Sequence, residues 1–106
     1  MTPEQARAEM ARHAGIQPES AIVTQVRHYL QALGWMVIRH HQSLGSHRGL
    51  SDLTAIRQGR TVWIECKTAK GKQSGYQSVF QDELEAHGGE YRIVRGIDDV
   101  ADMGRS

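Results

Sequence analysis

The chain has 106 residues, of which 39% are hydrophobic and 24% are charged, which suits a single globular domain with a modest core. It contains no run of 18 apolar residues and no apolar segment near its N-terminus, so we expect neither a transmembrane helix nor a secretory signal. The single cysteine, Cys66, cannot form a disulfide within the chain, and a reducing cytoplasm is the expected location.

The net charge of +1 is distributed unevenly along the chain. Residues 1–34 are neutral, residues 35–72 carry a net charge of +5, and residues 73–106 carry a net charge of −4. A basic central segment favours a polyanionic partner such as nucleic acid. A solvated basic loop would produce the same pattern, so the charge alone leaves both interpretations open.

The N-terminal segment is expected to differ from the rest of the chain. Residues 1–18 are interpreted as a loosely attached arm, because Gly15 and Pro18 interrupt any single helix. Residues 19–106 are interpreted as one domain of the α/β class, with helices packed around one mixed sheet.

This domain is expected to begin with a helix and a strand. Apolar residues recur at helical spacing from about Glu19 to Leu33, and Gly34 is expected to cap the C-terminus of that helix. The mostly apolar run from Trp35 to Ile38 predicts a well-buried strand. A polar loop from His41 to Ser51 follows, and the six histidines of the chain lack the spacing of zinc ligands.

Residues 52–67 have the pattern of a β-hairpin whose two-residue turn is Gln58-Gly59. With that turn, Asp52 lies directly opposite Glu65 on the neighbouring strand. A loop of three or five residues would shift the register by one residue and place the two carboxylates on opposite faces.

Two carboxylates that face each other repel unless a cation neutralises them. Lys67 follows Glu65 by two residues and is expected on the same face of the strand. Two carboxylates beside a lysine predict a magnesium site that a substrate phosphate would complete. Simple neutralisation of Glu65 by Lys67 is the alternative. Cys66 falls on the opposite face and is expected in the core rather than as a nucleophile.

The last third of the chain is expected to contain a loop, a helix, a strand and a short helix. Residues 68–75 form a basic, glycine-containing loop that ends at Ser74, a predicted N-cap, with Gln77 at the third position of the helix. The expected elements after this loop are a helix over Tyr76–His87, a strand over Glu90–Arg95 and a short helix over Ile97–Met103.

Four short motifs together resemble a known nuclease family. They are Gly49-Leu50-Ser51-Asp52-Leu53, Glu65-Cys66-Lys67, Gly71 with Ser74-Gly75-Tyr76-Gln77, and Gly88-Gly89-Glu90-Tyr91. From about Glu19 to Asp99 the chain resembles the virus-type replication–repair nuclease (VRR-NUC) domain of the PD-(D/E)XK nuclease superfamily. Ser51 stands where that family usually has proline, and Val23 stands where a glutamine often follows the helix glutamate.

The resemblance implies a restriction-endonuclease-like fold with the order α-β-β-β-α-β, here followed by a short C-terminal helix. It also implies metal-dependent hydrolysis of DNA by a stand-alone, phage-type enzyme in the bacterial cytosol, with no membrane association. Branched DNA, Holliday junctions included, is the implied substrate. A homodimer would place two sites on two strands. The apolar residues of the strand Trp35–Ile38 and of the first helix support the dimer, as does Trp63 on the face of Glu65.

The resemblance also implies roles for individual residues. Lys67 would contact the attacking water or a non-bridging phosphate oxygen, and Gln77 would orient Lys67 or that water. The implied ligands of Mg²⁺, for which Mn²⁺ is expected to substitute, are Asp52, Glu65, the backbone carbonyl of Cys66 and Glu19. Candidate DNA contacts are Arg39, His47, Arg48, Lys70, Lys72 and Ser74, although each one alone could simply be solvated.

Two other functions compete with that of a metal-dependent endonuclease. A catalytically inactive relative could bind DNA or a protein partner, but it would have no reason to retain Asp52, Glu65 and Lys67 together. A restriction-type enzyme with base-specific cutting would need recognition insertions, for which 106 residues leave little room.

Overall fold

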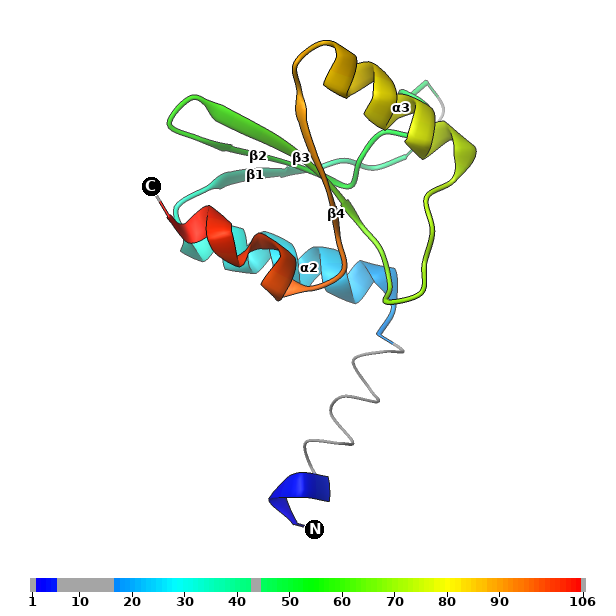
Figure 1. Ribbon diagram of the computed structural model, residues 1–106. Coiled ribbons are helices and arrows are strands. Elements are labelled where there is room, and N and C mark those ends of the chain that lie inside the picture. The colour runs from blue at the N-terminus through cyan, green and yellow to red at the C-terminus, as the bar shows by residue number, and fades with distance from the viewer. Residues whose placement is uncertain (1, 6–16, 43–44, 106) are drawn as a thin grey trace.

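The computed structural model describes residues 2–5, 17–42 and 45–105 of the chain. A four-stranded mixed sheet carries helix α2 and a 3-10 helix, η1, on one face and helix α3 on the other (Figure 1). The elements are α2 Glu19–Ala32, β1 Met36–Arg39, β2 Leu53–Arg57, β3 Arg60–Cys66, α3 Gly75–Ala86, β4 Glu90–Val94 and η1 Ile97–Gly104. Most of the predicted arm over residues 1–18 lies outside the described residues, so that expectation stays a prediction.

The strands follow the order β1-β2-β3-β4 across the sheet. Strands β1 and β2 are antiparallel, as are β2 and β3, whereas β3 and β4 are parallel because α3 forms the connection between them. This arrangement is restriction-endonuclease-like, and the predicted order of elements is confirmed. Among the described residues no helix is long and apolar enough to cross a membrane.

The predicted register of the β2–β3 hairpin is confirmed. Gln58 and Gly59 form the turn with φ angles of 49° and 81°, the left-handed values that a type I′ turn requires at both positions. Leu53 pairs with Ile64, so the next pair toward the end of the sheet is Asp52 and Glu65. A local turn preference therefore brings together two carboxylates that are 13 residues apart.

Helix α2 supplies one side of the core. Its residues Ile22, Val23, Val26 and Leu30 are buried against the sheet, so the apolar face of this helix is covered within the monomer. The helix ends in a Schellman motif in which the Trp35 amide donates to the Leu30 carbonyl at 3.0 Å. Gly34 has a φ angle of 94° in this motif, as its predicted role as a cap requires.

Strand β1 differs from the expectation that it is well buried. Met36 is 62% exposed and Ile38 is 39% exposed, while Val37 packs against the core. The strand lies at the edge of the sheet, and its outward face is left uncovered because α3 packs over β4. The prediction of burial on both faces was wrong because an apolar run does not reveal whether a second layer covers it.

Candidate active site

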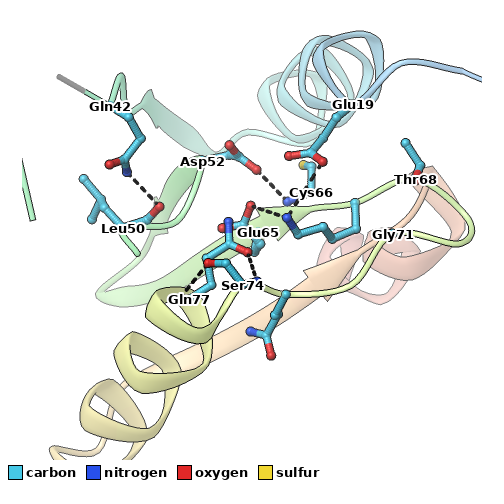
Figure 2. Close-up of polar contacts among 12 residues, drawn as sticks. Glu19, Gln42, Leu50, Asp52, Glu65, Cys66, Thr68, Gly71, Ser74 and Gln77 are labelled. Carbon is cyan, nitrogen blue, oxygen red and sulfur yellow. Dashed lines mark hydrogen bonds and ion pairs between the residues drawn. The ribbon is translucent and has the colours of Figure 1, made fainter. Parts of the chain in front are cut away.

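Three carboxylates meet at one end of the sheet (Figure 2). Glu19 comes from the first turn of α2, Asp52 directly precedes β2, and Glu65 lies near the end of β3. Each residue offers one carboxylate oxygen, and these three oxygens all lie within 4.8 Å of one another. The structure thus brings Glu19 together with the two hairpin carboxylates.

Asp52 is oriented by its neighbours on both sides. The Cys66 amide donates to Asp52 Oδ2 at 2.8 Å, and the His40 amide donates to the Asp52 carbonyl at 2.8 Å. The His40 ring stacks on Trp63 at 5.8 Å between centroids, and its Nε2 lies 2.6 Å from Thr54 Oγ1. Burial lowers the pKa of His40 and the Asp52 carboxylate opposes that effect, so burial favours the neutral form of the ring beside the cluster.

Glu65 is the buried member of the cluster. It is 1% exposed, and neither of its carboxylate oxygens has a hydrogen-bond partner among the described residues. Burial raises the pKa of Glu65 to about 9, and the neighbouring Asp52 carboxylate adds to the effect, whereas Lys67 opposes it. Burial penalises the charged form of Glu65, and a divalent cation, which prefers hard oxygen ligands, would stabilise that form. The donor set of the cluster therefore fits a divalent metal.

Lys67 extends its ammonium group into this cluster. Its Nζ lies 3.8 Å from Glu19 Oε2 and 3.9 Å from Glu65 Oε1, which are ion-pair rather than hydrogen-bond distances. Lys67 is only 8% exposed, and its backbone amide donates to the Val94 carbonyl at 2.9 Å, which anchors it to β4. One ammonium group faces three carboxyl groups, so simple neutralisation of Glu65 by Lys67 does not account for the cluster.

Cys66 lies in the core, as expected. It is fully buried on the α2 face of the sheet, and burial raises the pKa of its thiol, with the nearby carboxylates acting in the same direction. A thiol with a raised pKa is a poor nucleophile at neutral pH.

Ser74 and Gln77 form the predicted N-terminal cap of α3. Gln77 N donates to Ser74 Oγ at 3.2 Å, and Ser74 N donates to Gln77 Oε1 at 2.9 Å, which completes a capping box. The box places Gln77 on the side of the sheet that carries Glu65 (Figure 2). Because its Oε1 is engaged in the cap, Gln77 would act on Lys67 or a water through its Nε2 amide.

Two of the candidate DNA contacts lie against α3. The Arg48 guanidinium stacks over the Tyr76 ring at 5.0 Å, and its Nη1 donates to the Tyr76 hydroxyl at 2.6 Å. The His47 ring meets the Phe80 ring edge-on at 5.3 Å. Both contacts attach the β1–β2 loop to the helix, and both basic side chains remain exposed.

The other basic candidates lie on segments that adjoin the carboxylates in the chain or in the sheet. Arg39 pairs with Leu53 at the end of the sheet that carries Asp52. Lys70 and Lys72 are exposed on the loop that directly follows Lys67. Arg39 and the 68–75 loop thus both adjoin segments that carry members of the carboxylate cluster.

Arg95 organises that loop, a role that sequence reasoning missed. Its Nη1 donates to the carbonyl oxygens of Thr68 at 2.6 Å, Gly71 at 2.8 Å and Ala69 at 3.3 Å. These acceptors precede Arg95 by 24 to 27 residues, so no local pattern reveals the contact. Arg95 thereby holds the segment that carries Lys70.

Gly49 permits the close contact between the β1–β2 loop and α3. Its φ angle is 75°, and a Cβ atom there would lie 2.1 Å from the Tyr76 carbonyl oxygen. We expect Gly49→Ala to lower the free energy of unfolding by about 2–4 kcal/mol, because the backbone strain adds to a clash with another backbone segment. Chemical denaturation measures this change.

Gly45→Ala provides the matched control for that substitution. Gly45 has a φ angle of 91°, but a Cβ atom there would meet nothing within 4 Å. In this variant only the backbone strain should lower the free energy of unfolding, by about 1–2 kcal/mol. Equal losses in the two variants would contradict the packing role of Gly49.

The fold and the site together define a class of enzyme. A mixed four-stranded sheet that presents one carboxylate before β2 and a Glu-x-Lys sequence at the end of β3 is the core of a PD-(D/E)XK-type nuclease. Residues 12–93 match the archaeal Holliday junction resolvase (Hjc) family, and the chain belongs to that family.

A solved structure shows a similar fold. A chain described as a VRR_NUC domain superposes with a TM-score of 0.69 and 20% sequence identity, over 80% of this chain and 91% of that chain. The resemblance to the VRR-NUC domain is therefore confirmed, since both proteins belong to the same nuclease superfamily. Curated proteins gave no match.

Proposed function

We propose that the chain is a metal-dependent endonuclease that hydrolyses phosphodiester bonds in branched DNA, four-way junctions included. The observation that carries the proposal is the cluster of Glu19, Asp52 and Glu65 beside Lys67, in which the buried Glu65 oxygens lack hydrogen-bond partners among the described residues. The family to which the chain belongs is described by its action on Holliday junctions, which supports branched DNA as the substrate.

The metal ligands would be Asp52, Glu65, the backbone carbonyl of Cys66 and Glu19. Mg²⁺ bound there would neutralise charge on the phosphoryl oxygens and lower the pKa of a bound water, and Mn²⁺ is expected to serve as well. The Cys66 amide holds the Asp52 carboxylate in position for this task.

The remaining groups of the chain act on the water and the phosphate. Lys67 lies within 4 Å of two of the carboxylates, so its ammonium group would contact the attacking water or a non-bridging oxygen. Gln77 would donate from Nε2 to orient that water. Basic side chains on the β1–β2 loop and the 68–75 loop would bind flanking phosphates, which positions DNA without reading its sequence.

The substrate proposal is tested by a cleavage assay in Mg²⁺ on linear, nicked, flapped and four-way DNA, with Asp52→Ala as the control. We expect the four-way junction to be cut in preference to linear duplex, and the Asp52→Ala variant to be inactive. An inactive DNA- or partner-binding module of the same fold is the alternative, and it would bind these substrates without cutting any of them.

Lys70 and Lys72 supply a separate test of DNA binding. Replacing both with glutamine is expected to weaken binding roughly uniformly across sequences and to reduce the slope of log K against log salt by about one to two units. Fluorescence anisotropy at several salt concentrations measures this slope.

The double variant Arg57→Gln and Arg105→Gln removes the same charge from the opposite end of the sheet. Arg57 pairs with Arg60, which precedes Glu65 by five residues. At about 3.4 Å per residue, Arg57 therefore lies about 17 Å from Glu65 along the strand direction. This control should retain more of the wild-type slope. An unchanged slope in the lysine variant would show that the 68–75 loop is merely solvated.

A dimer in solution is the expected assembly, at micromolar concentration and without DNA. The exposed residues Met36 and Ile38 lie on the outward face of edge strand β1, and a two-fold partner would cover them. Trp35 does not contribute, because it is 4% exposed and its indole donates to the Met103 carbonyl at 2.9 Å. Two subunits would hold two cleavage sites at a fixed separation, as paired incision of a junction requires.

Light scattering tests this assembly. Replacing Met36 and Ile38 with lysine should shift the mass toward the 11.9 kDa monomer, whereas Val79→Lys, at an exposed position of α3, should not. A wild-type mass near 11.9 kDa throughout the micromolar range would exclude the dimer. Nicking of flaps or duplex would then be the better functional proposal.

A further inference from the structure

A groove lies between the β1–β2 loop and α3, beside the carboxylate cluster but separate from it. It has a volume of about 300 Å³, at the lower end of the range of small-molecule pockets, about 300–1,000 Å³. The residues that line it are His47, Phe80, Glu83, Leu84 and His87. Gly49 packs against the Tyr76 backbone one turn before Phe80, so the loop that carries His47 is held close to α3.

The base of the groove is aromatic and continues toward the cluster. The Phe80 ring lies 5.3 Å from the His47 ring, at an interplanar angle of 63°, and 5.9 Å from the Trp63 ring. Trp63 precedes Glu65 by two residues on the same face of β3, a separation of about 7 Å. The groove is therefore near the site at which a phosphodiester would be held.

Two polar groups at the α3 side of the groove can accept hydrogen bonds. His87 Nδ1 lies 2.7 Å from the Glu83 carbonyl, and because a carbonyl only accepts, Nδ1 carries a proton in this contact, which makes Nε2 the acceptor nitrogen of this tautomer. The Glu83 carboxylate is a second acceptor. A carboxylate repels a phosphate group, whereas amino groups on base edges donate to such acceptors, as cytosine does to glutamate.

We propose that this groove binds one unpaired nucleobase of the DNA between Phe80 and His47, whose rings lie at 63° to each other, so that one ring stacks on the base and the other meets its edge. A paired base keeps its faces inside the duplex, so only an unpaired base offers both a ring face and a donor edge to the groove. The proposal rests on the proposed function, because it names the feature of branched DNA that the same nuclease would recognise. Arg48, stacked on Tyr76 one turn before Phe80, would hold the adjoining phosphate.

The test uses a short duplex with 2-aminopurine as a single-nucleotide bulge, without added divalent metal so that no cleavage occurs. Binding of the full-length protein should quench the probe, because stacking on an aromatic ring quenches its emission. Affinity for the bulged DNA should exceed that for the fully paired duplex by about fivefold to a hundredfold, the range for one base stacked on an aromatic side chain.

Two variants and a matched control locate the effect. Phe80→Leu keeps the apolar volume but removes the ring, and His47→Ala removes an exposed ring without disturbing the core. Both variants should lose the quenching and most of the preference for the bulge. His28→Ala removes another exposed histidine, from α2, and should retain both the quenching and the preference for the bulge.

Unquenched emission with the wild type, or equal quenching in the wild type and both variants, would overturn the proposal. Occupation of the groove by a second copy of the chain would also overturn the proposal. In that case light scattering would show that Phe80→Leu dissociates to monomers, and the emission of the DNA probe would be the same with this variant as with the wild type. Because the assay contains no divalent metal, its outcome is independent of cleavage. A protein that quenches the probe but cuts no DNA would contradict the proposed function alone.

Discussion

Replacing either Asp52 or Glu65 with alanine is expected to abolish DNA cleavage in Mg²⁺. The two side chains converge with Glu19 so that their oxygens lie within 4.8 Å of one another, and each would be a metal ligand. Changes to groups that only orient a ligand typically cost about 10- to 100-fold in metal affinity or activity, so loss of a ligand should reduce the cleavage rate more than a hundredfold. Single-turnover kinetics on a four-way junction measure this loss.

Lys67→Ala separates catalysis from metal binding. Its ammonium group lies beside the carboxylates but cannot coordinate a cation, so the variant should still bind Mn²⁺ in calorimetric titration while its cleavage rate falls. Asp82→Ala and Glu85→Ala remove exposed carboxylates of α3 and serve as controls for charge. Wild-type activity in the Asp52 or Glu65 variant would show that the site has been assigned wrongly.

Replacing Glu65 with glutamine, which does not titrate, is expected to stabilise the metal-free protein. An unfolded glutamate releases its proton near pH 4.5, whereas Glu65 in the folded protein holds its proton to about pH 9. The folded state binds more protons across this window, so the free energy of unfolding should fall as pH rises through it. Glu65→Gln should reduce that dependence and exceed the wild type in stability by about 1–3 kcal/mol near pH 8.

Urea denaturation in the presence of a chelator measures this effect at several pH values. Glu85→Gln removes an exposed carboxylate of α3 and should retain the wild-type slope. Added Mg²⁺ should stabilise the wild type more than Glu65→Gln, because only the wild type retains the complete ligand set. A clear loss of metal-free stability in both the Asp52 and the Glu65 variants would favour a purely structural role for the pair.

The hairpin shows why part of the site was predictable. Gln58-Gly59 prefers one turn type, that turn sets the pairing of β2 with β3, and the pairing places Asp52 opposite Glu65. The capping box of Ser74 and Gln77 was predictable for the same reason, since its hydrogen bonds join residues three positions apart. In both cases the determining contacts lie within a few residues of one another.

The exposure of strand β1 and the position of Glu19 depend on contacts between distant segments, which local sequence patterns do not reveal. The apolar run before Arg39 predicted a buried strand, but the position of α3 over β4 leaves Met36 and Ile38 exposed. Glu19 was assigned through the family resemblance alone, and only the packing of α2 on the sheet brings it within reach of Asp52.

By itself, the sequence determined the order of the elements, the register of the hairpin and both caps, because turn preference, periodicity and capping act over a few residues. Its short motifs also indicated the nuclease superfamily. The tertiary structure alone decided the third carboxylate of the cluster, the Arg95 contacts with the 68–71 carbonyls and the groove between the β1–β2 loop and α3. These features join segments that are distant in the chain, and their geometry depends on how whole layers pack. The burial that raises the pKa of Glu65 belongs to this second group, since it exists only when the layers close over the end of β3.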